Sequence, residues 1–178
     1  MNPQTECSIM NIPPELRNLI YRYTLIETEG DAEISIPASG APPQHPPLLH
    51  TCRLIRKEAT AIYFEENKFA FELRDFDNTR LRRWCGLSRQ HRDTPVIFKF
   101  WGRPVWTNLL QWLEDYHNEL CPGCDAAIFG SCNPMSIACR LFRFVDDQEE
   151  RRETDWEELR SILEVMHQCL VIENPDWR

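Results

Sequence analysis

The sequence is poor in glycine and lacks the short motifs that mark common enzymes. Only six of its 178 residues are glycine, which leaves little material for a glycine-rich loop that holds phosphate. It contains no G-x-S-x-G elbow, H-E-x-x-H metal motif or dinucleotide fingerprint. We therefore assign no catalytic residue, and we expect a protein that is not an enzyme and needs no cofactor.

Long apolar runs and a surplus of positive charge are also missing. No run approaches the roughly 18 apolar residues of a membrane span. The first ten residues, MNPQTECSIM, lack the basic start and apolar centre of a secretory signal. The net charge of −8 argues against nucleic acid as a general partner. These features favour a cytoplasmic or nuclear protein with no membrane partner.

The charge is nevertheless unevenly distributed along the chain. Residues 53–103 carry 12 basic and 7 acidic side chains, and within them RLRRW (80–84) and KFWGRPVW (99–106) place aromatic rings beside cations. Such a segment could bind nucleic acid. The competing interpretation is a solvated face whose charges pair with the acidic last third of the chain.

Hydrophobic periodicity predicts helices that alternate with short strands. The helices are expected from Pro14 to about Glu27, from Leu48 to Glu65, near 77–86, from Trp106 to Leu120, and from Thr154 onward. The strands are expected at 32–36, 68–73, 95–101 and 137–145. This order indicates an α+β fold, in which amphipathic helices pack on a small mixed sheet, and residues 1–178 form a single compact domain. In the last helix the expected core positions are Trp156, Leu159, Leu163, Met166 and Leu170.

The eight cysteines raise the question of metal binding. Cys121-Pro-Gly-Cys124 resembles half of a zinc site, with Cys132, Cys139 and His117 as further candidate ligands. One interpretation of the chain is therefore a small zinc-stabilised domain whose basic surface binds nucleic acid. It is the alternative to the non-enzymatic protein-interaction module that is described below. Against it, the second pair of cysteines is widely spaced, so we assign no metal ligand. Cys52 and Cys169, which lie among apolar residues, are expected to be small buried side chains.

The first helix carries a continuous apolar stripe. Pro13-Pro14-Glu15 favours a helix start, and Leu16, Leu19, Ile20 and Tyr23 follow at helical spacing. A stripe of this kind normally belongs to the core of the domain. It would be available to a partner only if Ile12, Leu16 or Ile20 remained exposed.

Two segments resemble the F-box-like domains that are abundant in filamentous fungi. The matching residues are Ile12, Pro14, Glu15, Leu16 and Arg17, then Leu48, Leu49, Cys52, Arg53, Ile55, Arg56, Glu58 and Ala59, then Asn67, Phe69 and Phe71. The F-box-like segment spans residues 12–73, and residues 74–178 form an α+β remainder. A proline-rich loop at 37–47 stands where the family has a short middle helix. A related fungal domain has paired Glu-x-Arg motifs; this chain has the first one, at Glu15-Leu16-Arg17.

The resemblance implies a substrate adaptor of a cullin–RING ubiquitin ligase. Its partners would be a Skp-type linker subunit and a target protein that the resemblance does not identify. The residues expected to bind the partner are Ile12, Pro14, Glu15, Leu16, Ile20, Arg53 and Arg56. In the alternative interpretation, Glu15 and Arg17 form a polar network with Arg53 and Glu58 that braces the two helices.

Overall fold

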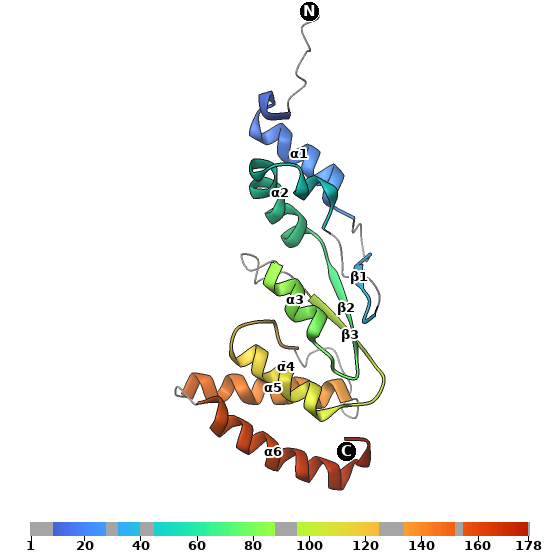
Figure 1. The fold of residues 1–178 in the computed structure, drawn as a ribbon, viewed down its shortest axis with the longest axis vertical. Coiled ribbons are helices and arrows are strands. Elements are labelled where there is room, and N and C mark those ends of the chain that lie inside the picture. Colours follow the sequence, from blue (N-terminus) through green and yellow to red (C-terminus); the bar gives the residue numbers. More distant parts are fainter. Residues whose placement is uncertain are drawn as a thin grey trace, which may run out of the picture.

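In the part of the chain that the structure describes, six α-helices and three strands succeed one another along an elongated molecule (Figure 1). The computed structural model describes residues 9–27, 32–39, 45–87, 96–124, 134–151 and 155–177. The elements are α1 Pro14–Leu25, β1 Ile34–Ile36, α2 Arg53–Glu66, β2 Phe69–Arg74, α3 Thr79–Leu87, β3 Val96–Trp101, α4 Trp106–His117, α5 Pro134–Arg151 and α6 Trp156–Glu173. Short 3-10 turns, η1 Ile9–Asn11, η2 Pro47–His50 and η4 Pro175–Trp177, complete the order. The expected α+β class is confirmed.

The sheet is entirely parallel in the described part of the chain, where the sequence analysis expected a mixed one. Its strand order is β1-β2-β3, with Ile34 opposite Phe69 and Phe69 opposite Val96. Parallel neighbours need a long crossover connection, usually a helix. The chain provides one each time, because α2 lies between β1 and β2 and α3 lies between β2 and β3. The parallel arrangement therefore follows from the alternation of elements.

The central strand β2 is the most deeply buried element of the fold. Phe69, Ala70, Phe71 and Leu73 are all 1% exposed or less. The ring of Trp84, on α3, packs 5.2 Å from the centroids of the Phe69 and Phe71 rings. A strand covered in this way reads as a nearly continuous apolar run, as is typical of parallel sheets.

Helix α5 corrects the strand that the sequence predicted over 137–145. Its buried apolar residues are Met135, Ala138, Cys139, Leu141, Phe142 and Val145. Most of these are three or four positions apart, which is the spacing of one helix face. Pro134 stands at the start, where a proline is well tolerated in a helix. The short apolar run alone did not distinguish the two structures, and the polar residues that follow extend the helix.

Helix α6 buries a smaller face than the sequence predicted. Trp156, Leu159 and Leu163 are buried as expected, but Met166 is 37% exposed and Leu170 is only half-buried. The expected helix start at Thr154 lies outside the described residues, and Asp155 is the N-cap. A single cluster of buried side chains nevertheless extends from Tyr21 on α1 to Trp177 in η4, consistent with one domain.

Asn67 joins the ends of the first two helices to the sheet. Its side-chain amide donates hydrogen bonds to the carbonyls of Leu25 (2.8 Å) and Tyr63 (2.9 Å), and its carbonyl accepts one from the amide of Glu27 (2.9 Å). Carbonyls in the last turn of a helix have no partner within the helix. One buried side chain therefore serves the C-terminal ends of both α1 and α2, two residues before β2 begins.

The elements are arranged in sequence from one end of the molecule to the other. Helices α1 and α2 occupy one end, the sheet and α3 the middle, and α4, α5 and α6 the other end (Figure 1). Of the expected loop at 37–47, residues 40–44 lie outside the described part. No helix in the described ranges combines the length and the hydropathy that a membrane span requires.

We predict that Gly102→Ala destabilises the fold by roughly 1–3 kcal/mol. Gly102 follows β3 with a φ of +96°, and a Cβ atom there would lie 2.2 Å from Oδ1 of Asp75. Chemical denaturation of both proteins measures the difference. Gly86→Ala on α3 is the matched control, because nothing lies within 4 Å of its added Cβ atom. An equal stability of the Gly102 variant and the wild type would contradict the prediction.

Candidate interaction site on the first two helices

Helix α1 turns a partly polar face toward the rest of the protein. Its buried residues are Arg17, Tyr21 and Leu25, spaced by four, and the element that it packs against is α2. A surface helix normally turns its apolar stripe inward and its charges outward. In α1, however, the first residue of the inward face is an arginine, Arg17.

The arginine is held by a bidentate ion pair with α2. Nε of Arg17 lies 2.9 Å from Oε2 of Glu58, and Nη2 lies 2.6 Å from Oε1. The Tyr21 hydroxyl donates to Oε2 of the same carboxylate at 3.0 Å, and Nη1 of Arg17 donates to the carbonyl of Ile12 at 2.8 Å. Paired hydrogen bonds between a guanidinium and a carboxylate fix relative orientation as well as distance. They set the rotation of α1 about its own axis.

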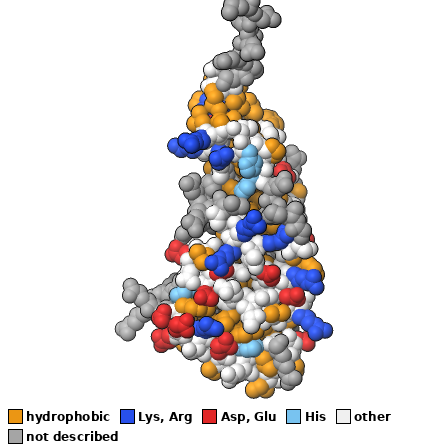
Figure 2. All heavy atoms as spheres, viewed as in Figure 1, with side chains coloured by type: hydrophobic (Ala, Val, Ile, Leu, Met, Phe, Trp, Pro, Cys, Tyr) orange, Lys and Arg blue, Asp and Glu red, His pale blue; other side chains and the backbone are white. Residues whose placement is uncertain are grey.

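The apolar stripe of α1 consequently faces outward. Leu16 is 51% exposed, Leu19 47%, Ile20 38% and Tyr23 89%. We call these four residues the α1 apolar face. Figure 2 shows hydrophobic side chains gathered at this end of the molecule. Apolar residues exposed singly are common, but four on one helix stripe are typical of an interaction surface.

The neighbouring helix α2 also carries an exposed large apolar residue. The α1–α2 contacts join Arg17 to Glu58 and Arg22 to Glu66, so the two helices run in the same direction. Leu54, which is 46% exposed, lies one turn before Glu58, beside the start of α1. Helical spacing placed Leu19 and Tyr23 in the stripe, but the sequence analysis selected neither of them, nor Leu54, as a partner-binding residue.

The other predicted partner-binding residues lie around the same end. Pro14, Glu15 and Arg53 are exposed, and Ile12 is half-buried. Arg56 is also exposed, and its Nε donates to the carbonyl of Leu49 at 2.8 Å, which ties η2 to α2. Of the polar network proposed as the alternative, the structure contains the Arg17–Glu58 pair. In the described part of the chain Glu15 and Arg53 make no ion pair with it.

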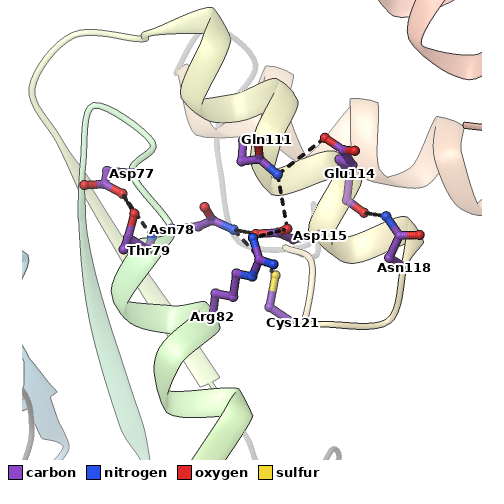
Figure 3. Close-up of polar contacts among 9 residues, drawn as sticks. All are labelled: Asp77, Asn78, Thr79, Arg82, Gln111, Glu114, Asp115, Asn118 and Cys121. Carbon is purple, nitrogen blue, oxygen red and sulfur yellow. Dashed lines mark hydrogen bonds and ion pairs between the residues drawn. The ribbon is translucent and has the colours of Figure 1, made fainter. Parts of the chain in front are cut away.

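A second polar cluster, at the other side of the sheet, surrounds Asp115. Figure 3 shows Asn78, Arg82 and Gln111 gathered around this carboxylate, which is 2% exposed. Asn78 Nδ2 donates at 2.8 Å, Gln111 Nε2 at 3.2 Å, and Arg82 Nη1 lies 3.1 Å away. Asn78 Nδ2 also lies 3.7 Å from Sγ of Cys121. The buried charge is thus satisfied by donors from α3, α4 and the turn before α3, and the cluster holds these segments together.

The Cys-Pro-Gly-Cys turn is a packing element. The carbonyl of Pro122 accepts a hydrogen bond from the indole of Trp112 at 3.0 Å. A Cβ atom on Gly123 would lie 2.8 Å from Cδ1 of Phe142, so only glycine fits against α5. Cys124 is buried behind this turn, 7% exposed.

The structure brings the candidate zinc ligands of the alternative interpretation only partly together. Cys124 and Cys139 line one cavity of about 330 Å³, together with Tyr116, Gly123, Phe142, Arg143 and Asp146. His117 packs against Trp156, 5.5 Å between ring centroids, and Cys132 lies outside the described residues. Within the described residues no group of three or more His, Cys, Asp or Glu side chains is arranged to hold a metal ion.

Burial makes two of the thiols poor nucleophiles. It raises the pKa of Cys121 to about 12, and the nearby Cys85 adds to this effect. Burial likewise raises the pKa of Cys85 to about 12. Since the thiolate is the reactive form, both remain inert thiols at neutral pH. In contrast, Cys52 and Cys169 are exposed, which corrects the expectation that they are buried. Cys52 is the N-cap of α2, and its Sγ accepts from the amide of Ile55.

Several cations of the basic segment are paired with carboxylates. Arg82 pairs with Asp115, in the acidic segment 104–178, and Lys99 lies 2.6 Å from Glu33. Arg74 lies beside Asp75 and over the ring of Trp101, 5.0 Å from its centroid. This part of the surface therefore fits the interpretation of a solvated, paired face better than that of a nucleic-acid site.

The chain matches no family model, no curated protein and no solved structure. Among the described surfaces, the α1 apolar face combines exposed apolar residues with a rigid polar support beneath them.

We predict that Glu58→Gln reduces stability at neutral pH and that this effect disappears in acid. Hydrogen bonds from Arg17, and a weaker one from Tyr21, hold the pKa of Glu58 below its ordinary value of 4.5. The stabilisation is therefore complete above pH 4.5 and is lost as the pH falls through the lower folded-state pKa. Denaturant unfolding between about pH 7 and about pH 3 measures the gap between variant and wild type. A gap that stays constant would contradict the prediction; Glu15→Gln, at an exposed position of α1, is the control.

We predict that iodoacetamide modifies Cys52 and Cys169 in the folded protein at neutral pH, and Cys85 and Cys121 only after unfolding. The first two thiols are exposed, whereas burial raises the pKa of the other two to about 12. Peptide mass mapping of the native and denatured protein identifies each site. Rapid modification of Cys121 in the folded state would contradict the prediction and indicate an activated thiol.

Proposed function

We propose that the protein is a non-enzymatic interaction module that docks a partner on the α1 apolar face. The observation that carries the proposal is the inverted orientation of α1, with Arg17 inside and Leu16, Leu19 and Ile20 outside. Exposed apolar side chains on a helix favour association, because their burial in an interface removes them from water.

The support beneath this face makes it suitable for binding. The Arg17–Glu58 pair and the Tyr21 hydrogen bond hold α1 in one rotation, so the outward side chains are positioned before a partner arrives. Preorganisation of this kind reduces the conformational entropy that binding must overcome. A helix held only by apolar contacts could turn its stripe inward instead.

The partner that the F-box resemblance implies is a Skp-type linker subunit. The protein would then be a substrate adaptor of a cullin–RING ubiquitin ligase in the cytoplasm or nucleus, with residues 74–178 available to a target. The geometry favours this over the alternative of a zinc-stabilised nucleic-acid module. The basic side chains Arg82 and Lys99 are paired with carboxylates, while the apolar face is uncovered. The high pKa of the Cys85 and Cys121 thiols favours a role other than thiol catalysis.

We predict that Leu16→Asp abolishes co-elution with a purified fungal Skp-type linker on a sizing column. The side chain is 51% exposed in the free protein, so the variant should fold. In the complex, however, an unpaired carboxylate would be buried at a cost of several kcal/mol. Calorimetry on the mixture measures the affinity, and circular dichroism verifies the fold.

Two control variants make the result specific. Asn18→Ala changes α1 outside the apolar face. Val165→Asp introduces the same charge at a 59% exposed apolar position on α6, at the far end of the molecule. Both should retain the complex. A wild-type protein that is folded but forms no complex would overturn the linker as partner, and loss of folding in Leu16→Asp would place that residue in the core.

A further inference from the structure

A second exposed apolar surface lies on α6. Trp156, Leu159 and Leu163 face the protein, whereas Ile162 is 38% exposed, Val165 59%, Met166 37% and Ile172 80%, and Cys169 is exposed beside them. We call Ile162, Val165, Met166, Cys169 and Ile172 the α6 stripe. Helices α1 and α6 lie at opposite ends of the molecule, so this surface is separate from the α1 apolar face (Figure 1).

The α6 stripe has the spacing of a coiled-coil seam. Ile162, Val165, Cys169 and Ile172 follow one another at intervals of three, four and three residues. This is the heptad pattern of a and d positions, which suits packing against one further helix. Met166 lies beside the seam and widens it. The geometry thus points to a helical occupant.

The charges around the stripe are acidic. Glu158 lies four residues before Ile162 and Glu173 four residues after Cys169, so a carboxylate stands at each end of the stripe. The only arginine of α6, Arg160, lies on a different side of the helix, since it is separated from Val165 by five residues. His167 faces inward, stacked on Trp106 at 4.3 Å and bonded to the carbonyl of Trp177.

The same charges disfavour a second copy of the chain as the occupant. In a parallel pair of α6 helices, Glu158 would face Glu158 and Glu173 would face Glu173. In an antiparallel pair, Glu158 of one copy would approach Glu173 of the other. Both arrangements place like charges together at the ends of the seam, which costs affinity and directs binding elsewhere.

We propose that the α6 stripe is a docking site for a basic amphipathic helix of another protein. Apolar side chains of that helix cover Ile162, Val165 and Ile172, and its lysines or arginines meet Glu158 and Glu173. The proposal does not depend on what the α1 apolar face binds. If the protein is an adaptor, it defines the class of target segment that the far end accepts.

The test uses synthetic helical peptides and the full chain. The first peptide is three heptads long, with leucine at a and d and lysine at e and g; the second carries glutamate at e and g; the third has the first composition in scrambled order. Fluorescence anisotropy at about 0.15 M salt, where distant charges are largely screened, measures the affinities. The seam-bearing lysine peptide should bind about tenfold more tightly than either of the others.

Variants of the protein locate the binding. Val165→Asp should lower the affinity of the protein for the lysine peptide about tenfold or more, because the position is central in the stripe. Leu16→Asp, the matched change on α1, should leave its affinity unchanged. The double variant Glu158→Lys with Glu173→Lys should reverse the preference, so that the glutamate peptide binds more tightly. Bound lysine peptide should also slow alkylation of Cys169 by iodoacetamide and leave the rate at Cys52 unchanged.

Three outcomes would overturn the proposal. Equal affinity for the lysine and scrambled peptides would indicate general attraction to the acidic surface. An unchanged affinity in Val165→Asp would place the peptide elsewhere. A concentration-dependent dimer of the wild type that is lost in Val165→Asp, measured by light scattering, would make a second copy the occupant. Because none of these three outcomes depends on the linker or on a change in α1, failure here is distinguishable from failure of the proposed function.

Discussion

The carboxylate of Glu58 determines which face of α1 packs on α2 and which face is exposed to solvent. It accepts both arms of the Arg17 guanidinium and the Tyr21 hydroxyl, and in doing so it turns one face of α1 inward. The apolar residues one position away on the helix must then face outward. Tyr21 and Leu25 are buried on the same face. Contact of Leu16 and Ile20 with α2 would require α1 to turn by about 100°, which would break this ion pair.

The sequence was most informative where one pattern had one structural meaning. The alternation of helices and strands was sufficient for the α+β class, and it contained the reason for the parallel sheet, because a helix separates each strand from the next. The strand that was predicted over 137–145 is part of helix α5; the prediction was wrong because a short apolar run fits the periodicity of a strand and that of a helix equally well. Its helical form is favoured by Pro134 before the run and by the polar residues after it.

The candidate site was only half predictable, for a related reason. Spacing identified the stripe of Leu16, Leu19, Ile20 and Tyr23, but it does not say whether a stripe is buried or exposed. That depends on a partner 41 residues away, since Arg17 and Glu58 meet only in the folded chain. The same limit applies to α6, where Met166 was assigned to the core although the helix buries a narrower face. Its heptad seam was present in the sequence, beside residues already chosen as core.

The amide of Asn67 has a consequence for the dynamics of this layout. A helix at the end of an elongated molecule would ordinarily open to solvent on its own. Here one buried side chain holds the last turns of both α1 and α2, directly before the best-protected strand of the sheet. Local unfolding of α1 therefore breaks bonds that also stabilise the entry into β2. We therefore expect the two helices and the central strand to unfold together, and the backbone amides at the end of α1 to exchange with solvent more slowly than those of a helix end without such a bond.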